Sequence, residues 1–369
     1  IALLSLMLAS CNTASEKKQE IMNPFLTAYN TPFEVPPFDQ IQNQHFMPAI
    51  LEGIEMQKQE IDAIVANQDV ANFANTIEAL DASGMMLRNV SNVFFNLQSA
   101  HTSAELQQLA KEASKPLSGH NDDILLNQKL FDRIAAVNEQ KDQLGLTTEQ
   151  QTLLEKTYQR FARNGAALDE ADKEKLRKIN EELSLLSLQF DENLLAETNE
   201  FQLIVENEAE LAGLPQSVKD AAAEAAADAG YEGKWVFTLH KPSLIPFLQY
   251  ADNRDLREQL FKAYINRANN DNANDNKKIA SREAALRVKR ANLLGYPTHA
   301  DYVLEVNMSK KPENVYAFLN EVLEPARTMA TKEAAELQKM VYAEGGDFDL
   351  QAWDWWYYAE KLKMQKYDL

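Results

Sequence analysis

Histidine and cysteine, the side chains that most often bind catalytic metals, are few in this chain of 369 residues. No histidine is followed by Glu and no two stand four residues apart, so the HExxH pattern that puts two zinc ligands on one helix face is absent. Cys11 is the single cysteine, which excludes an intramolecular disulfide and a zinc site built from several cysteines. We therefore predict no catalytic and no metal-binding residue in this chain. We expect hydrogen-bonded structural roles for its histidines: His45, His101, His120, His240 and His299.

Two polar clusters contain residue types that can bind cations. The segment 268–276, ANNDNANDN, carries many side-chain oxygens, but Ala273 interrupts their alternation and the glycine of a calcium loop is missing. We expect a solvated connector between two helices there. The sequence HNDD, from His120 to Asp123, has no metal-binding spacing, and its two aspartates suit the first turn of a helix. Both clusters are therefore predicted to be structural.

An aromatic run, WDWWYY at 353–358, could stack against sugars or bases. On a helix, Trp353, Trp356, Tyr357 and Glu360 share one face, which indicates a core or a domain interface instead. Bases are further disfavoured because 37 Lys and Arg against 56 Asp and Glu give a net charge of −19, which repels phosphate. We therefore expect no nucleic-acid partner. A glycine-rich phosphate loop and a GxSxG nucleophile motif are also absent from the sequence.

The elements that would position these residues are mostly helices. Only 11 glycines and 12 prolines occur, too few for the many tight turns of a β-sandwich or barrel. The clearest helix is expected over 170–198, where apolar residues recur every three or four positions and Asp169 suits the N-cap. We predict a mostly α fold of one or more large multi-helix lobes, with a small β element near 201–205 and 234–239. Further helices are expected at about 103–114, 122–142, 148–163, 221–229, 243–250, 253–267, 276–294, 298–306, 312–343 and 351–364.

The first residues have the pattern of an export signal. The apolar run 1–8 is too short to span a bilayer, but it has the length of a signal-peptide core. The following LASC, ending at Cys11, resembles the lipobox of bacterial lipoproteins, in which the cysteine carries the lipid. The alternative is a cysteine at the end of a buried helix. We expect a lipid-anchored protein of the bacterial cell envelope, facing the periplasm, with the membrane as a partner through Cys11.

A proline-rich stretch follows the polar residues 12–20. Because proline fixes φ and removes a backbone donor, residues 23–38 are predicted to form an extended arm. The arm could be a proline-rich ligand for a signalling domain. We favour an arm packed across the domain surface, because Phe25, Phe33 and Phe38 should be buried.

Ordered landmarks between residues 230 and 362 are the most specific feature of the sequence. They are GKWVFTL at 233–239, YADNR at 250–254, AYINR at 263–267, ANLLGY at 291–296, ADY at 300–302 and AWDWWYYAEKL at 352–362. The arm adds NPF at 23–25 and PFDQI at 37–41. Together these motifs resemble the thimet oligopeptidase family of zinc metallopeptidases, and within it the bacterial peptidyl-dipeptidase (dipeptidyl carboxypeptidase) branch. The resemblance covers about residues 23–369.

This resemblance implies a mostly helical, two-lobed enzyme whose deep channel admits short, unfolded oligopeptides and which releases dipeptides from their C-termini. Family members bind one zinc ion through the two histidines of an HExxH helix and a downstream Glu, and the HExxH Glu activates the zinc-bound water. That site lies C-terminal to the region matched here, so the ligands are expected beyond residue 369. We therefore interpret the chain as the N-terminal part of a longer enzyme, inactive alone.

The export-signal pattern and the resemblance together predict how the chain is divided. We expect a lipoprotein signal remnant at 1–10, a lipidated polar tether at 11–22, an N-terminal helical lobe at 23–245 and the start of the catalytic peptidase region at 246–369. Two alternative hypotheses assign the chain no enzymatic function. The chain could be a non-enzymatic helical lipoprotein that binds peptides, or a helical scaffold without a ligand.

Overall fold

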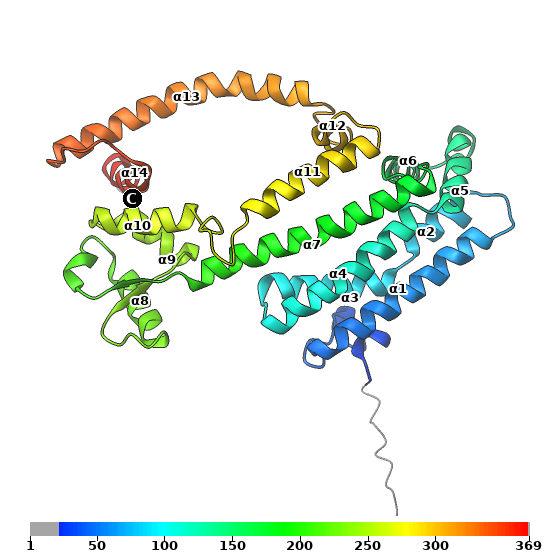
Figure 1. Ribbon diagram of the computed structural model, residues 1–369, viewed down its shortest axis with the longest axis horizontal. Helices are drawn as coiled ribbons and strands as arrows, with labels where there is room; N and C mark the ends of the chain where they lie inside the picture. The colour runs from blue at the N-terminus through cyan, green and yellow to red at the C-terminus, as the bar shows by residue number, and fades with distance from the viewer. Residues whose placement is uncertain (1–21, 368–369) are drawn as a thin grey trace, which may run out of the picture. The chain divides into compact units, whose positions relative to one another are not determined.

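The structure, a computed structural model, describes residues 22–367 and confirms the predicted fold class (Figure 1). Within this range the chain is mainly helical, and its strands form one two-stranded sheet. The strands are β1 (Leu203–Val205) and β2 (Trp235–Phe237). The helices are α1 (Asn43–Ala66), α2 (Ala79–Ala82), α3 (Met85–Ala100), α4 (Ala104–Leu125), α5 (Gln128–Glu139), α6 (Thr148–Arg163), α7 (Glu170–Glu200), α8 (Gln216–Asp228), α9 (Lys241–Tyr250), α10 (Arg254–Ile265), α11 (Lys277–Leu293), α12 (His299–Leu304), α13 (Pro312–Ala343) and α14 (Ala352–Tyr367).

The described chain divides into two compact units. One contains residues 22–70 and 74–113, and the other contains residues 71–73 and 114–367. In the first unit, α1 and α3 pack together and the short 3₁₀ turn Pro24–Leu26 contacts both. The rings of Phe25, Phe46 and Phe94 form the contact, with successive centroids 5.4 and 5.0 Å apart. These buried rings are the centre of that unit.

The proline-rich arm is only partly buried, which corrects one expectation. Phe25 is buried as predicted, but Phe33 is 98% exposed and Phe38 is 54% exposed. Phe33 lies in the 3₁₀ turn Pro32–Glu34, where its backbone is left-handed with φ 58°. Prolines on both sides restrict this segment to tight turns, and in this conformation the ring faces solvent.

In the second unit, α7 and α11 lie side by side (Figure 1). Asp169 caps α7 as predicted, because its carboxylate accepts a hydrogen bond of 2.8 Å from the backbone N–H of Asp172. Two polar contacts join the helices further along: Ser187 donates to Glu283 at 2.9 Å, and Arg282 contacts Glu182 through two bonds of 2.6 and 2.7 Å. These contacts fix the face of α11 that packs against α7.

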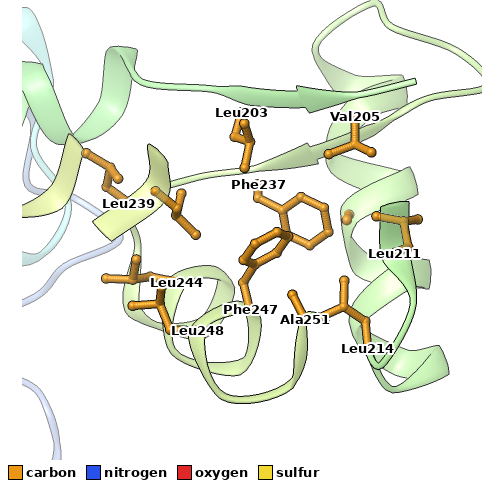
Figure 2. Close-up of a cluster of buried hydrophobic side chains, with 12 residues drawn as sticks. Leu203, Val205, Leu211, Leu214, Phe237, Leu239, Leu244, Phe247, Leu248 and Ala251 are labelled. Carbon is orange, nitrogen blue, oxygen red and sulfur yellow. The ribbon is translucent and has the colours of Figure 1, made fainter. Parts of the chain in front are cut away.

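The small β element forms where it was predicted and packs on a cluster of buried apolar residues. β1 and β2 pair antiparallel, with Leu203 opposite Phe237 and Val205 opposite Trp235. Apolar side chains from this sheet meet those of α9 and of the segment 211–214 (Figure 2). The rings of Phe237 and Phe247 cross nearly edge to face, with centroids 4.5 Å apart. This cluster fixes α9 beneath the sheet.

Two helices differ from the prediction. Instead of helices at 103–114 and 122–142, α4 runs unbroken from Ala104 to Leu125 and α5 starts at Gln128. Pro116 lies inside α4, where it removes one backbone hydrogen bond without ending the helix. Asn127 caps α5 by accepting from the backbone N–H of Leu130 at 3.0 Å. The pair Asp122 and Asp123 therefore lies in the last turns of α4, and the expected place in a first helical turn is wrong.

The helix α13 has the predicted bounds, 312–343. Pro312 occupies its first position, where no intrahelical hydrogen bond is lost, and Gly345 has φ 85° just beyond its end. Near this end, Leu337 and Val341 pack on Tyr357 and Tyr358 of α14. The α13–α14 contact thus has a small apolar core of its own.

Candidate functional site

A buried carboxylate joins α10 to α14. Asp354 has no exposed surface, and its oxygens accept three hydrogen bonds of 2.9 to 3.1 Å from the guanidinium of Arg254. Arg257, one turn further along α10, adds a bond of 2.9 Å from Nη2. The carboxylate also accepts from the backbone N–H of Gln351 at 3.0 Å, which caps the first turn of α14. One side chain therefore fixes both the start of α14 and its place on α10.

The two arginines that meet Asp354 are themselves held by further partners. Arg257 donates through Nη1 to the carbonyl oxygen of Ala251 at 2.7 Å, and its guanidinium lies 4.0 Å from the ring centroid of Tyr357. Arg254 lies 4.1 Å from the ring centroid of Phe348, and hydrogen bonding to Asp354 raises the pKa of Arg254. Buried charges are stable only with such partners. These groups are occupied with one another, so their role here is to position helices.

Tyr357 continues the network towards α9. Its hydroxyl donates to Asp252 at 2.7 Å, and burial raises the pKa of this phenol. Glu360, one turn later on α14, accepts from Gln249 at 3.0 Å and from the hydroxyl of Tyr250 at 3.3 Å. These polar contacts, together with those of Asp354, hold α9 and α10 to α14.

The aromatic run at 353–358 is partly core, as the interface interpretation predicted. Tyr357 and Tyr358 are buried, whereas Trp356 is 40% exposed although it was expected on the same face. Asp354 is the buried residue that the sequence argument missed. The available signal was an acidic residue inside a run of aromatic side chains, which is an unusual place for a solvated carboxylate.

A second polar site lies in the same unit, between α4, α7 and α11. It is a cavity of about 350 Å³. Asp122 of α4 is 3% exposed there and accepts a hydrogen bond from Asn180 of α7 at 2.9 Å. Burial raises the pKa of Asp122 to about 6. Its neighbour Asp123 instead faces Arg177 in an ion pair of 2.7 Å. The HNDD cluster is thus divided between a buried acid and a surface pair.

The asparagine-rich connector is more firmly attached than a solvated loop. Asn270 donates to Glu197 of α7 at 2.5 Å, and Asn272 donates to the same carboxylate. Asn276 is buried, donates to the carbonyl oxygen of Phe190 at 2.9 Å and accepts from Asn193 at 2.9 Å. The segment is a connector between α10 and α11, as predicted, with residues 269–273 exposed and Asn276 docked on α7.

Two histidines have the structural role that was expected. His45 accepts through Nδ1 from the backbone N–H of Gln42 at 3.0 Å and so caps α1. His240 lies within hydrogen-bonding distance of Thr238 and Asn199. His299 differs, because burial lowers its pKa and its Nδ1 has no hydrogen-bond partner within 22–367.

The described residues do not fit a zinc site. Between residues 22 and 367, no group of three or more His, Cys, Asp or Glu side chains is placed to hold a metal ion. Across the same range, no helix has both the length and the apolar character needed to cross a membrane. Cys11 lies outside the described residues, and its lipidation stays a prediction.

Comparison with known proteins shows which family the C-terminal third of the chain matches. Residues 247–369 match the sequence profile of Peptidase family M3. Dipeptidyl carboxypeptidase of Escherichia coli is 40% identical over 348 residues, which are 94% of this chain and 51% of that protein. Oligopeptidase A of the same organism is 31% identical over 351 residues, again 94% of this chain and 51% of the relative. The chain thus spans about half the length of the curated relatives it matches.

The expected location in the bacterial cell envelope is wrong. The relatives include the protein named "Probable cytosolic oligopeptidase A" of Arabidopsis thaliana, which is 29% identical over 352 residues, 91% of this chain and 49% of that protein. A short apolar run before a cysteine is a pattern of composition and does not by itself specify export. The resemblance drawn from the ordered landmarks, in contrast, is confirmed by the comparisons. Residues 247–369 of the chain thus match Peptidase family M3, and the chain is similar over most of its length to dipeptidyl carboxypeptidases and oligopeptidases A.

Proposed function

We propose that this chain is part of a zinc metallopeptidase that releases dipeptides from the C-termini of oligopeptides. The observation that carries the proposal is the 40% identity to dipeptidyl carboxypeptidase of Escherichia coli across 94% of the chain. Because the chain spans 51% of that relative, the activity is proposed for a protein of the relative's full length. Oligopeptides are the proposed substrates.

We place the metal outside this chain. No described residues form a group that could hold zinc, and the sequence lacks an HExxH motif. The zinc ligands and the general base are therefore proposed to come from a further part of the full-length protein. In this division, residues 23–245 form a helical lobe and residues 246–369 begin the catalytic region. Zinc, when bound, would polarise a substrate carbonyl or activate a water molecule.

We propose that this chain contributes structural support for the catalytic region. The family match begins at residue 247, inside α9, and includes α10 and α14. These are the helices that Asp354, Arg254 and Arg257 hold together. A site must be held within a fraction of an ångström by the elements around it. We infer that the α9–α10–α14 assembly is a rigid base for the catalytic region.

The test uses the protein expressed from its complete reading frame, with bound zinc, and a short N-acetylated oligopeptide. Mass spectrometry should find dipeptides leaving the C-terminus in succession, and a C-terminally amidated copy should be cut more slowly. Chelation of the metal should abolish cleavage, and the 369-residue chain alone should be inactive. Removal of residues from the N-terminus, or binding of the peptide without any cleavage by the zinc-loaded protein, would contradict the proposal.

A further inference from the structure

The cavity between α4, α7 and α11 has the construction of a small-molecule site. Its volume of about 350 Å³ is near the lower end of the range of about 300–1,000 Å³ that is typical of ligand pockets. Three buried leucines, Leu125, Leu176 and Leu183, form an apolar part of its wall. Polar side chains also line the cavity, and two of them, Asn121 and Ser187, are exposed. Solvent therefore reaches a cavity that is apolar on one side and polar on the other.

Two opposite charges face this cavity without contacting each other. Asp122 is buried in α4, and Arg290 comes from α11, 168 positions later in the chain. No hydrogen bond or ion pair is found between the two side chains within the described structure, although the positive charge of Arg290 acts to lower the pKa of Asp122. The Nε of Arg290 is buried and has no hydrogen-bond partner within residues 22–367. A buried donor in this state costs free energy until an acceptor fills its place.

The second arginine of the cavity is already neutralised. Arg287 contacts Glu283 on its own helix at 2.9 Å, so this pair adds no net charge. The charged groups that remain are the guanidinium of Arg290 and the carboxylate of Asp122. An anion without a positive group would be attracted by Arg290 but repelled by Asp122. A cation without a negative group would be attracted by Asp122 but repelled by Arg290. A ligand that carries both charges satisfies both groups, because each end then has an opposite partner.

We propose that this cavity binds a free α-amino acid with an aliphatic side chain. Its carboxylate accepts hydrogen bonds from Arg290, its ammonium group donates to Asp122, and its side chain lies against the leucine wall. Asn180 holds the carboxylate of Asp122 in place through the 2.9 Å bond. The site is separate from the α9–α10–α14 assembly and does not depend on the proposed peptidase activity.

The first test is calorimetric titration of the protein, expressed from its complete reading frame, with L-leucine and two analogues. N-acetyl-L-leucine lacks the ammonium group, and L-leucinamide lacks the carboxylate. L-leucine should bind at one site, and each analogue should bind at least about 10-fold more weakly, since each loses one charge-assisted contact. Absence of saturable binding of L-leucine up to about 10 mM would overturn the proposal. Equal binding of either analogue would also overturn it, because one charged end would then be dispensable.

Variants locate the binding within the chain. Asp122→Asn keeps the shape and the oxygen to which Asn180 donates, and Arg290→Gln removes the guanidinium. Each should weaken L-leucine binding at least about 10-fold while the helical circular-dichroism spectrum stays unchanged. The matched control is Arg282→Gln, which removes an arginine of the same helix that pairs with Glu182 at the surface. Its affinity should equal that of the unaltered chain. Unchanged affinity in both cavity variants would show that leucine binds elsewhere and would overturn the assignment.

Discussion

The carboxylate of Asp354 lies 2.9 Å from Nη2 of Arg257, although both side chains are almost completely removed from solvent. The two residues are 97 positions apart and come from different helices. Arg254, whose side chain is partly exposed, also forms an ion pair with Asp354. A charge in such a place is tolerated when it is paired with an opposite charge, and it becomes costly when that partner is removed. The contact is therefore a sensitive point of the α10–α14 packing.

Truncation of Asp354 should destabilise this part of the molecule strongly. Asp354→Ala leaves Arg257 buried without its counter-ion, so we expect the free energy of unfolding to fall by about 3–5 kcal/mol. Three of the four tryptophans lie in α14, so tryptophan fluorescence during urea unfolding reports on this helix. The control Glu182→Ala breaks a two-bond arginine contact that is about half exposed, and should cost less than about 1 kcal/mol. Equal losses in the two variants would contradict the importance of burial.

A glycine next to the same assembly is expected to be intolerant of any side chain. Gly213 has φ 83°, and a Cβ atom there would come within 2.2 Å of the carbonyl oxygen of Tyr250. Gly230 has φ 82° but no neighbour within 4 Å of its Cβ position. Gly230→Ala should therefore cost only the left-handed backbone penalty, about 1–2 kcal/mol. Gly213→Ala adds a backbone clash, and thermal unfolding should show a clearly larger loss. Similar melting temperatures for both variants would rule out the close approach.

The docked connector gives a third prediction. Asn276 exchanges hydrogen bonds with α7, so Asn276→Ala should leave buried polar groups unpaired and lower the free energy of unfolding by about 1–3 kcal/mol. The loop 268–275 should also become more sensitive to limited proteolysis, because its attachment to α7 is weakened. Asn274→Ala, in the same connector, is the control and should change neither quantity by more than about 0.5 kcal/mol. A proteolysis rate that is the same for all three chains would show that Asn276 does not hold the loop.

Local features of the fold were largely predictable from the sequence. The bounds of α13 follow from Pro312 at its start and Gly345 after its end, and the N-cap Asp169 follows from its place before a periodic run. The short strands were found because β-branched and aromatic residues interrupt the helical period. Pro116 shows the limit of such signals. A proline inside a long amphipathic helix removes one bond, and packing of the remaining turns outweighs that loss.

The polar sites were not predictable in the same way. Asp354 and Arg254 both belong to the ordered landmarks, but only the folded chain brings them together across 100 positions. Asp122 was expected in a first helical turn, and its actual neighbours, Asn180 and Arg290, come from two other helices. Periodicity tells which face of a helix is apolar, but it does not tell which distant polar groups meet there. Such contacts depend on the tertiary packing.

Asp122 should make the stability of the chain depend on pH. Its pKa of about 6 in the folded state exceeds the ordinary value of 3.8, so the folded state binds this proton more tightly. The contribution of Asp122 to stability therefore falls as the pH rises from about 4 to about 6 and stays unfavourable above it. Asp122→Asn removes the buried charge, so it should be more stable than the unaltered chain at pH 8 by about 1–3 kcal/mol, with no difference near pH 4. Urea unfolding across this pH range measures the effect. Asp123→Asn, which removes a surface partner of Arg177, should show no gain at any pH, and a pH-independent difference for Asp122→Asn would refute the assignment.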